Sequence, residues 1–158
     1  MEYLVVKWLH IISSTILFGA GVGSAFHLVL AVLGRDVRDI AGTTRHVVVQ
    51  DWVFTAPSAV VQPLSGLWMM NLAGIPLATP WIRASLLLYA VAIGCWLPVV
   101  WIQLRLRAMA ADAARREAPL PRAWWGWFAG WVLLGVVGFT AFLAIFWLMV
   151  AKRVPFGE

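Results

Sequence analysis

Four long runs of apolar residues, separated by short polar segments, dominate the hydrophobic pattern of this chain. They cover about residues 3–33, 47–72, 84–104 and 124–151. A helix needs about 20 apolar residues to cross a hydrocarbon core of roughly 30 Å. The runs lack the alternation of strands, and lipid admits only helices or closed barrels. The pattern therefore predicts an all-α fold: a four-helix transmembrane bundle, connected up-down-up-down, that forms one integral membrane domain over residues 1–158.

The polar segments predict where the helices begin, extend and bend. Asp36 is a candidate N-cap for a helix whose residues 38–50 extend out of the membrane. The alanine-rich segment 108–116 is expected to carry the third helix into water before two prolines stop it. Pro57 and Pro63 are expected to bend the second helix, because each removes a backbone hydrogen-bond donor.

Composition supports a membrane protein. Hydrophobic residues make up 63% of the chain and charged residues 12%, whereas a soluble domain is about half apolar and about a quarter charged. The first apolar run is longer than the core of a signal peptide, and no basic segment precedes it. We therefore expect this first helix to be kept.

The net charge of +5 indicates membrane topology by its placement. Eight basic residues lie in or beside the first and third loops, and four lie on the opposite side: Arg35, Arg38, Arg45, Arg105, Arg107, Arg115, Arg116 and Arg122 against Lys7, Arg83, Lys152 and Arg153. The positive-inside rule then places loops one and three in the cytoplasm and both termini outside. The expected partner of these residues is the lipid bilayer, and no nucleic acid is expected.

The chain holds eleven tryptophans, and most lie near the ends of the apolar runs. Those near an end are interpreted as interfacial anchors: Trp8, Trp52, Trp81, Trp101, Trp124, Trp125 and Trp127. The remaining four are candidates to form the wall of a pocket: Trp68, Trp96, Trp131 and Trp147.

Two of the three histidines are predicted to lie at similar depth on neighbouring helices. If the first two helices are antiparallel, His27 lies opposite about residue 44, within one turn of His46. Two histidines on facing helices can hold a six-coordinate heme iron. Gly23, one turn before His27, leaves room for a ring edge, and Arg45 is a candidate partner for a heme propionate. The alternative is that His46 is an interfacial side chain and His27 a hydrogen-bonded helix residue.

His10 lies inside the first helix, about opposite residue 61 and therefore next to Gln62. Lys7, three residues earlier, is on a similar face and suits an anionic group such as a propionate. An imidazole in the membrane usually has a partner. That partner is either a heme iron, with His10 alone or with a histidine of a second copy, or a hydrogen-bonding group such as Gln62 or a serine.

Asp51 is a candidate functional carboxylate, because acids are rarely kept inside a membrane without a role. Its position favours a solvated or salt-bridged side chain near the interface. A metal site with His27 and His46 is disfavoured, because His46 and Asp51 point about 140° apart on a straight helix. The sequence holds no phosphate-binding loop and no HExxH, GxSxG or CxxC motif. No catalytic residue is therefore predicted.

Three segments carry a resemblance to known proteins: Leu4–Ile12 (LVVKWLHII), Asp51–Pro57 (DWVFTAP) with Val61–Gly66 (VQPLSG), and Cys95–Trp101 (CWLPVVW). With them the chain resembles a domain-of-unknown-function family of small bacterial four-span membrane proteins. The resemblance implies the bacterial inner membrane, with periplasmic termini if the basic residues set the orientation. The opening segment is also similar to HemJ-type protoporphyrinogen oxidases, which implies a b-type heme and a functional His10. Its similarity to CopD-type copper-resistance proteins implies copper instead.

These observations lead to one functional hypothesis and one alternative. The hypothesis is a small, cytochrome b-like membrane protein that binds heme b and acts in electron transfer or membrane redox chemistry, with a redox partner protein or as a homo-oligomer. The predicted iron ligands are His10, His27 and His46. The alternative is a cofactor-free membrane subunit or scaffold that packs against a partner protein. Whether the protein is an enzyme stays open.

Overall fold

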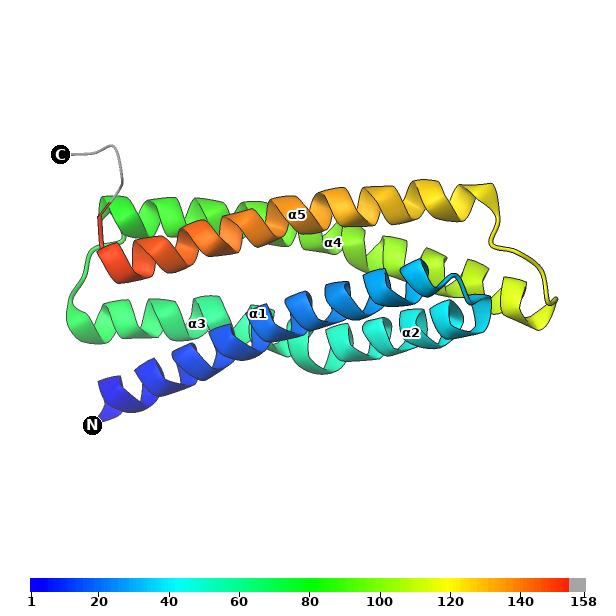
Figure 1. The fold of residues 1–158 in the computed structure, drawn as a ribbon. Coiled ribbons are helices and arrows are strands. Elements are labelled where there is room, and N and C mark those ends of the chain that lie inside the picture. The colour runs from blue at the N-terminus through cyan, green and yellow to red at the C-terminus, as the bar shows by residue number, and fades with distance from the viewer. Residues whose placement is uncertain (154–158) are drawn as a thin grey trace.

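The computed structural model describes residues 1–153, and all its regular elements are helices. They are α1 (Glu2–Gly34), α2 (Val37–Gln50), the π-helical turn η1 (Asp51–Thr55), α3 (Ala56–Ala73), α4 (Pro80–Arg115) and α5 (Arg122–Ala151). Because α2, η1 and α3 follow one another without a break, they form one long rod (Figure 1). The all-helical prediction is confirmed for residues 1–153, whereas the up-down-up-down arrangement of four spans stays a prediction.

Within residues 1–153, three helices are long and apolar enough to cross a membrane: α1, α4 and α5. The predicted second span, residues 47–72, lies within the α2–η1–α3 rod and does not form one uninterrupted helix of that kind. The π turn divides it, and α3 carries the polar side chains of Gln62 and Asn71 together with Pro63. Such residues lower the hydropathy of this segment relative to the other three runs.

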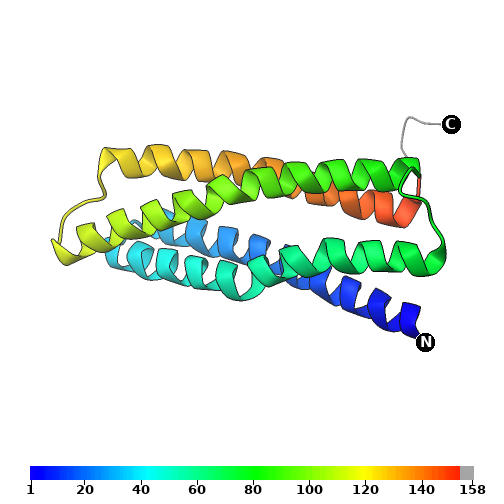
Figure 2. The same ribbon diagram turned by 180° about the vertical axis from the view of Figure 1, so that it is seen from behind.

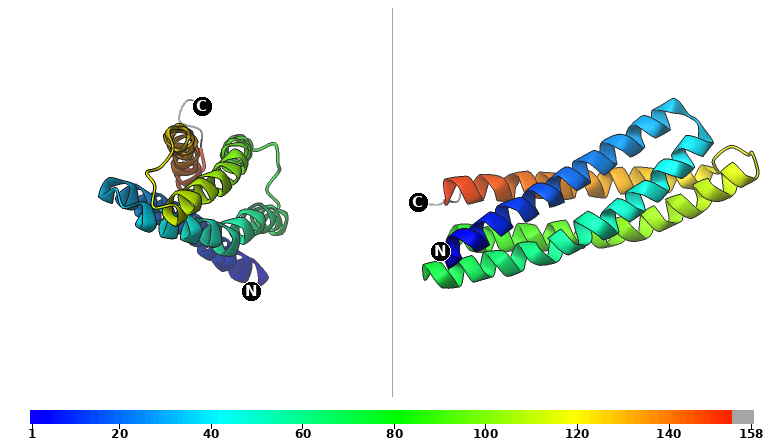
Figure 3. Two further views of the ribbon diagram at one scale, coloured as in Figure 1. Left: turned by 90° about the vertical axis from the view of Figure 1, so that its right-hand side faces the viewer. Right: turned by 90° about the horizontal axis from the view of Figure 1, so that it is seen from below.

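The helices form two layers that meet where α2 packs against α4. In one layer α4 packs against α5, and in the other α1 crosses the α2–η1–α3 rod at a slant (Figures 1, 2 and 3). The contact between α2 and α4 joins the layers at the end where α1 turns into α2. The first residue of the chain and the end of α5 both lie at the opposite end (Figure 1).

Residues in the polar segments explain where several helices begin and end. The Asp36 side chain accepts hydrogen bonds from the backbone N–H groups of Arg38 and Asp39, which confirms the predicted N-cap of α2. The α3–α4 turn begins at Gly74, whose φ of 63° favours a residue without a Cβ. The predicted charged extension of the third helix is also confirmed, because α4 continues to Arg115.

The best-packed part of the core lies toward the α1–α2 turn. Leu28, Ile40, Leu106 and Trp124 are almost completely buried there, and they belong to one cluster of contacting apolar side chains. Trp124 is 0% exposed, and its Nε1 atom donates to the backbone carbonyl of Leu106 at 3.1 Å. The interpretation of Trp124 as an interfacial anchor is therefore wrong. This ring instead fills the space between α4 and α5.

Candidate functional site

The π turn η1 places a carboxyl group inside the bundle. The N–H group of Ala56 donates to the carbonyl of Asp51, five residues back, and this widens the helix at that point. Pro57 follows immediately, and it has no N–H group to continue the ordinary helical pattern. Isolated π turns of this kind are frequent at functional sites. Asp51 and Thr55, at the two ends of the turn, are both buried.

Asp51 is 5% exposed, and one of its two oxygens has a clear partner. The Thr55 hydroxyl donates to Oδ1 at 2.9 Å, whereas Oδ2 has no hydrogen-bond partner. Gln103 and Trp96 of α4 face the carboxyl group. No salt bridge reaches Asp51 within residues 1–153. The prediction of a solvated or salt-bridged side chain at the interface is therefore wrong.

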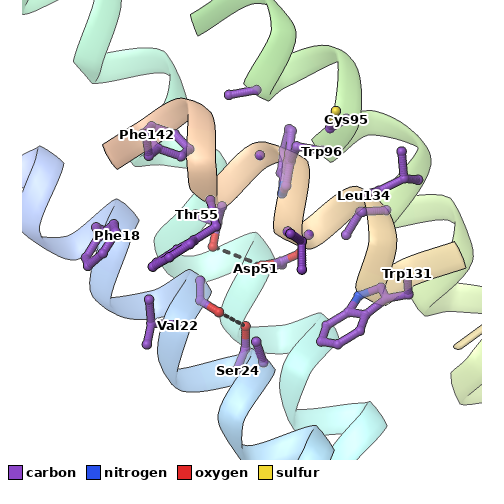
Figure 4. Close-up of a pocket in the computed structure, with 18 of the residues that line it drawn as sticks. Phe18, Val22, Ser24, Asp51, Thr55, Cys95, Trp96, Trp131, Leu134 and Phe142 are labelled. Carbon is purple, nitrogen blue, oxygen red and sulfur yellow. Dashed lines mark hydrogen bonds between the residues drawn. The ribbon is translucent and has the colours of Figure 1, made fainter. Parts of the chain in front are cut away.

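A cavity of about 460 Å³ lies beside this carboxyl group, between α1, η1, α4 and α5 (Figure 4). Most of its lining is aliphatic or aromatic, including Phe18 from α1 and Phe142 from α5. Among the described lining residues, Asp51 is the only one with an acidic side chain, and none is Lys, Arg or His. Small-molecule sites in proteins have volumes of roughly 300–1,000 Å³, apolar walls and a few polar groups. The cavity has these properties.

Three of the residues that line the cavity contain buried polar atoms without a hydrogen-bond partner. They are Oδ2 of Asp51 and the indole Nε1 atoms of Trp96 and Trp131 (Figure 4). Buried polar groups are nearly always hydrogen-bonded, because an unpaired one costs about 1–3 kcal/mol. Trp96 lies near enough to Asp51 to donate to its carboxyl group, and a ligand or water in the cavity can complete the remaining hydrogen bonds.

The sequence prediction for the pocket tryptophans is correct for two of the four. Trp96 and Trp131 line the cavity, as proposed for them. Trp68 and Trp147 are exposed instead, and the indole of Trp68 donates to Glu2 at the surface. The sequence positions of these tryptophans predict that they lie away from the membrane interface. They do not predict which face of each helix points into the bundle.

The second polar cluster of the bundle surrounds His10, between α1 and α3. The Ser65 hydroxyl donates to the carbonyl of Val61 at 2.7 Å, so it accepts from Nδ1 of His10 at 2.8 Å. This leaves Nε2 of His10 to accept from the Gln62 amide at 3.1 Å. Gly66 makes room for the ring, because a Cβ there would lie 3.3 Å from Cε1 of His10. Both hydrogen-bonding partners considered for His10, Gln62 or a serine, contact its ring, and ligation of heme iron by His10 stays a prediction.

The other predicted heme ligands lie elsewhere. His27 on α1 and His46 on α2 are both exposed, and so are Lys7 and Arg45. The two helices are neighbours as expected, and the amide of Gln50 donates to the carbonyl of Ala20 across them. None of the three histidines lines the cavity.

Gly23 also has a different neighbour from the one predicted. A Cβ at this position would lie 3.8 Å from the Gln50 side chain, so the amide of Gln50 occupies the space that was predicted for a ring edge. Within residues 1–153, no group of three or more His, Cys, Asp and Glu side chains is placed to hold a metal ion. The structure therefore brings Asp51, Trp96 and Trp131 together, and it leaves the histidines in separate places.

One comparison with known proteins gives a match. The model of a family described as predicted integral membrane protein (DUF2269) matches residues 4–153, which is nearly the whole chain. No curated protein and no solved structure matches the chain. The description of the family names no ligand or activity, and the likeness to HemJ-type and CopD-type proteins stays a prediction.

Proposed function

The chain belongs to the DUF2269 family of predicted integral membrane proteins, and from this premise we propose that it is a four-span protein of the bacterial inner membrane that binds a lipid-soluble small molecule within its helix bundle. The observation that carries this proposal is the apolar cavity with three unpartnered polar atoms on its lining residues. The bound molecule would supply hydrogen-bonding groups that the protein itself does not.

The proposed topology rests on three apolar helices and one composite rod. α1, α4 and α5 have the length and hydropathy of spans. The α2–η1–α3 rod runs beside α1 and returns the chain to the end where α1 begins (Figure 1). Gln62 of this rod is partly buried against α1, where its amide pairs with His10, so this polar group need not face lipid. The bias of basic residues toward the α1–α2 and α4–α5 turns supports cytoplasmic turns and periplasmic termini.

The exposure of the cavity lining between α1 and α5 supports entry of a ligand from the lipid. Phe26 of α1 and Val136 of α5 line the cavity and are 64% and 57% exposed. The cavity is therefore open to the surroundings between these two helices. In a membrane this opening faces hydrocarbon, so an apolar molecule can enter by diffusing sideways in the bilayer.

Two matched glycine substitutions in α5 test this function. Gly135 lines the cavity and Gly126 does not, and a Cβ at either position would meet no other atom within 4 Å. We expect Gly135→Phe to fill the cavity and Gly126→Phe to leave it open. Native mass spectrometry of protein extracted from its own membrane should show a bound small molecule in the wild type and in Gly126→Phe, but not in Gly135→Phe. Identical spectra for all three proteins, with no adduct, would contradict the proposal.

Heme binding is the second candidate, and one observation favours it. His10 donates from Nδ1 to Ser65, which leaves the lone pair of Nε2 available to a hydrogen-bond donor or to a metal. A bound heme would supply one-electron redox chemistry. His10 would have to exchange the Gln62 amide for iron, while His27 and His46 would hold a group only at the exposed surface of α1 and α2. The residues of the cavity do not fit a histidine-ligated heme.

An absorption spectrum of the purified protein, oxidised and reduced, tests the heme hypothesis. A Soret band that His10→Ala removes would support ligation by His10. No Soret band after expression with added heme would contradict heme binding. The cofactor-free scaffold predicts instead that substitution of each of the three histidines by alanine leaves a stable, functional protein.

A further inference from the structure

We propose that the molecule bound in this cavity is a lipophilic cation, whose positive charge is held by Asp51. The inference rests on the proposed function, because it names the chemical class of the ligand for the same cavity. Three features of the cavity lead to it: an acidic side chain without a basic partner, aromatic walls and the opening toward lipid.

The first feature is the balance of charge. Asp51 is 5% exposed, its Oδ2 atom has no hydrogen-bond partner, and no basic residue is among the described residues that line the cavity. A buried carboxylate without a counter-charge is strongly disfavoured, since the apolar surroundings replace little of its hydration. Such a carboxyl group stays protonated and neutral unless a counter-charge is present, and a cationic ligand supplies the counter-charge that the protein does not.

The second feature is the number of aromatic rings. Among the described residues, six aromatic side chains line the cavity: Phe18, Phe26, Trp96, Trp131, Phe139 and Phe142. The face of an aromatic ring attracts a cation within about 6 Å, and tryptophan does so most strongly. Aromatic walls around one carboxylate are suited to a positive charge that is spread over an apolar body. A small hydrated ion gains less, because it must give up its water.

The third feature is the shape of the opening. Phe18 of α1 stacks on Phe139 of α5 with ring centroids 5.4 Å apart, and it meets Phe146 edge-on at 5.3 Å. These contacts close the gap between the two helices toward the end of the bundle where α1 begins. Val22 of α1 and Val136 of α5 line the cavity and are exposed, so the open part begins one turn further along α1. Because Oδ2 of Asp51 is covered, contact with a ligand requires a small rotation of the carboxyl group.

The binding of two probes of the same shape, one cationic and one neutral, tests whether the cavity prefers a positive charge. Tetraphenylphosphonium and its neutral counterpart tetraphenylsilane have nearly the same shape, so they differ mainly in charge. Their binding to the wild type in nanodiscs should be measured by equilibrium dialysis against empty nanodiscs. We expect Asp51→Asn, which keeps the shape of the side chain, to weaken phosphonium binding at least tenfold and to leave silane binding unchanged. Asp112→Asn, at an exposed carboxylate near the end of α4, is the matched control and should change neither.

Two further variants keep the test decisive if Asp51→Asn does not fold. Asp51→Glu retains the charge and should retain the preference for the cation. Thr55→Val removes the hydroxyl that donates to Asp51 but leaves the charge, so it should also bind the phosphonium. Loss of the cation preference in both variants, with the protein folded, would contradict the assignment of the charge to Asp51.

The outcomes separate this inference from the function on which it rests. If both probes bind equally well and Asp51→Asn changes neither, the ligand is a neutral molecule: the cavity binds, but the inference about charge is overturned. If neither probe binds above the level of empty nanodiscs, and Gly135→Phe leaves the native adduct unchanged, the proposed function is overturned as well.

Discussion

Substitution of Trp124 gives the sharpest test of the packing in this bundle. The sequence favours an interfacial anchor at this position, whereas the structure buries the ring completely between α4 and α5. Its Nε1 atom donates to the carbonyl of Leu106, and its ring stacks on Phe128 with centroids 5.2 Å apart and planes 14° apart. An anchor and a core residue differ greatly in what their removal costs, so stability distinguishes them.

The expected loss in the free energy of unfolding follows from the contacts of the Trp124 ring. Truncation of a buried tryptophan to alanine leaves a large cavity and typically costs about 3–5 kcal/mol, which we expect for Trp124→Ala. Trp124→Phe keeps an aromatic ring against Phe128 but loses the hydrogen bond, worth about 0.5–1.5 kcal/mol, and some volume. Trp147 is 57% exposed, so Trp147→Ala should change the free energy of unfolding by only about 0.5 kcal/mol.

The free energy of unfolding of these variants can be measured by titrating folded protein in mixed micelles with a denaturing detergent and following helicity by circular dichroism. We expect the order wild type, Trp147→Ala, Trp124→Phe and Trp124→Ala, from most to least stable. Equal losses for the two alanine variants would refute the assignment of Trp124 to the core.

Three further predictions concern contacts elsewhere in the bundle. A double-mutant cycle of His10→Ala and Ser65→Ala should give a coupling free energy of about 0.6–1.5 kcal/mol for their hydrogen bond, and a coupling of zero would count against the contact. Gly74→Ala should lower the free energy of unfolding by about 1 kcal/mol, because φ is 63° there; an unchanged detergent midpoint would show that the turn tolerates a Cβ. Arg38 and Glu117 form an ion pair with side chains 74% and 75% exposed, so Glu117→Gln should cost less than about 1 kcal/mol in the same titration, and a clearly larger loss would contradict this weak role.

The sequence predicted the elements of this fold closely. The first apolar run, about residues 3–33, matches α1 (Glu2–Gly34). The cap at Asp36 and the charged extension of α4 were also predicted, because capping and the stopping of helices are local effects. The second run was the exception. The sequence predicts that its prolines bend the helix, whereas the structure widens the helix at Asp51–Thr55, just before Pro57.

The candidate site was predicted only in part. Asp51 was recognised as an unusual acid, and Trp96 and Trp131 as candidates for the wall of a pocket. That the three belong to one site was not predicted. Depth matching correctly placed Gln62 opposite His10, because the rise per residue of two antiparallel helices fixes depth. The same reasoning does not give the rotation of each helix about its axis, so it could not tell that His27 and His46 are exposed.

The amino-acid sequence by itself determined that this chain is helical, where α1 and α5 begin and end, and that it has the composition of an integral membrane protein. Tertiary structure alone decided which side of each helix faces the interior, and with it the burial of Asp51 and Trp124. The physical reason is that lipid and protein core are both apolar. A helix in a soluble protein reveals its inner face by its polar outer face, whereas a helix in a membrane is apolar all round. Only the packing of α1, η1, α4 and α5 against one another brings the acid and the two indoles to one cavity.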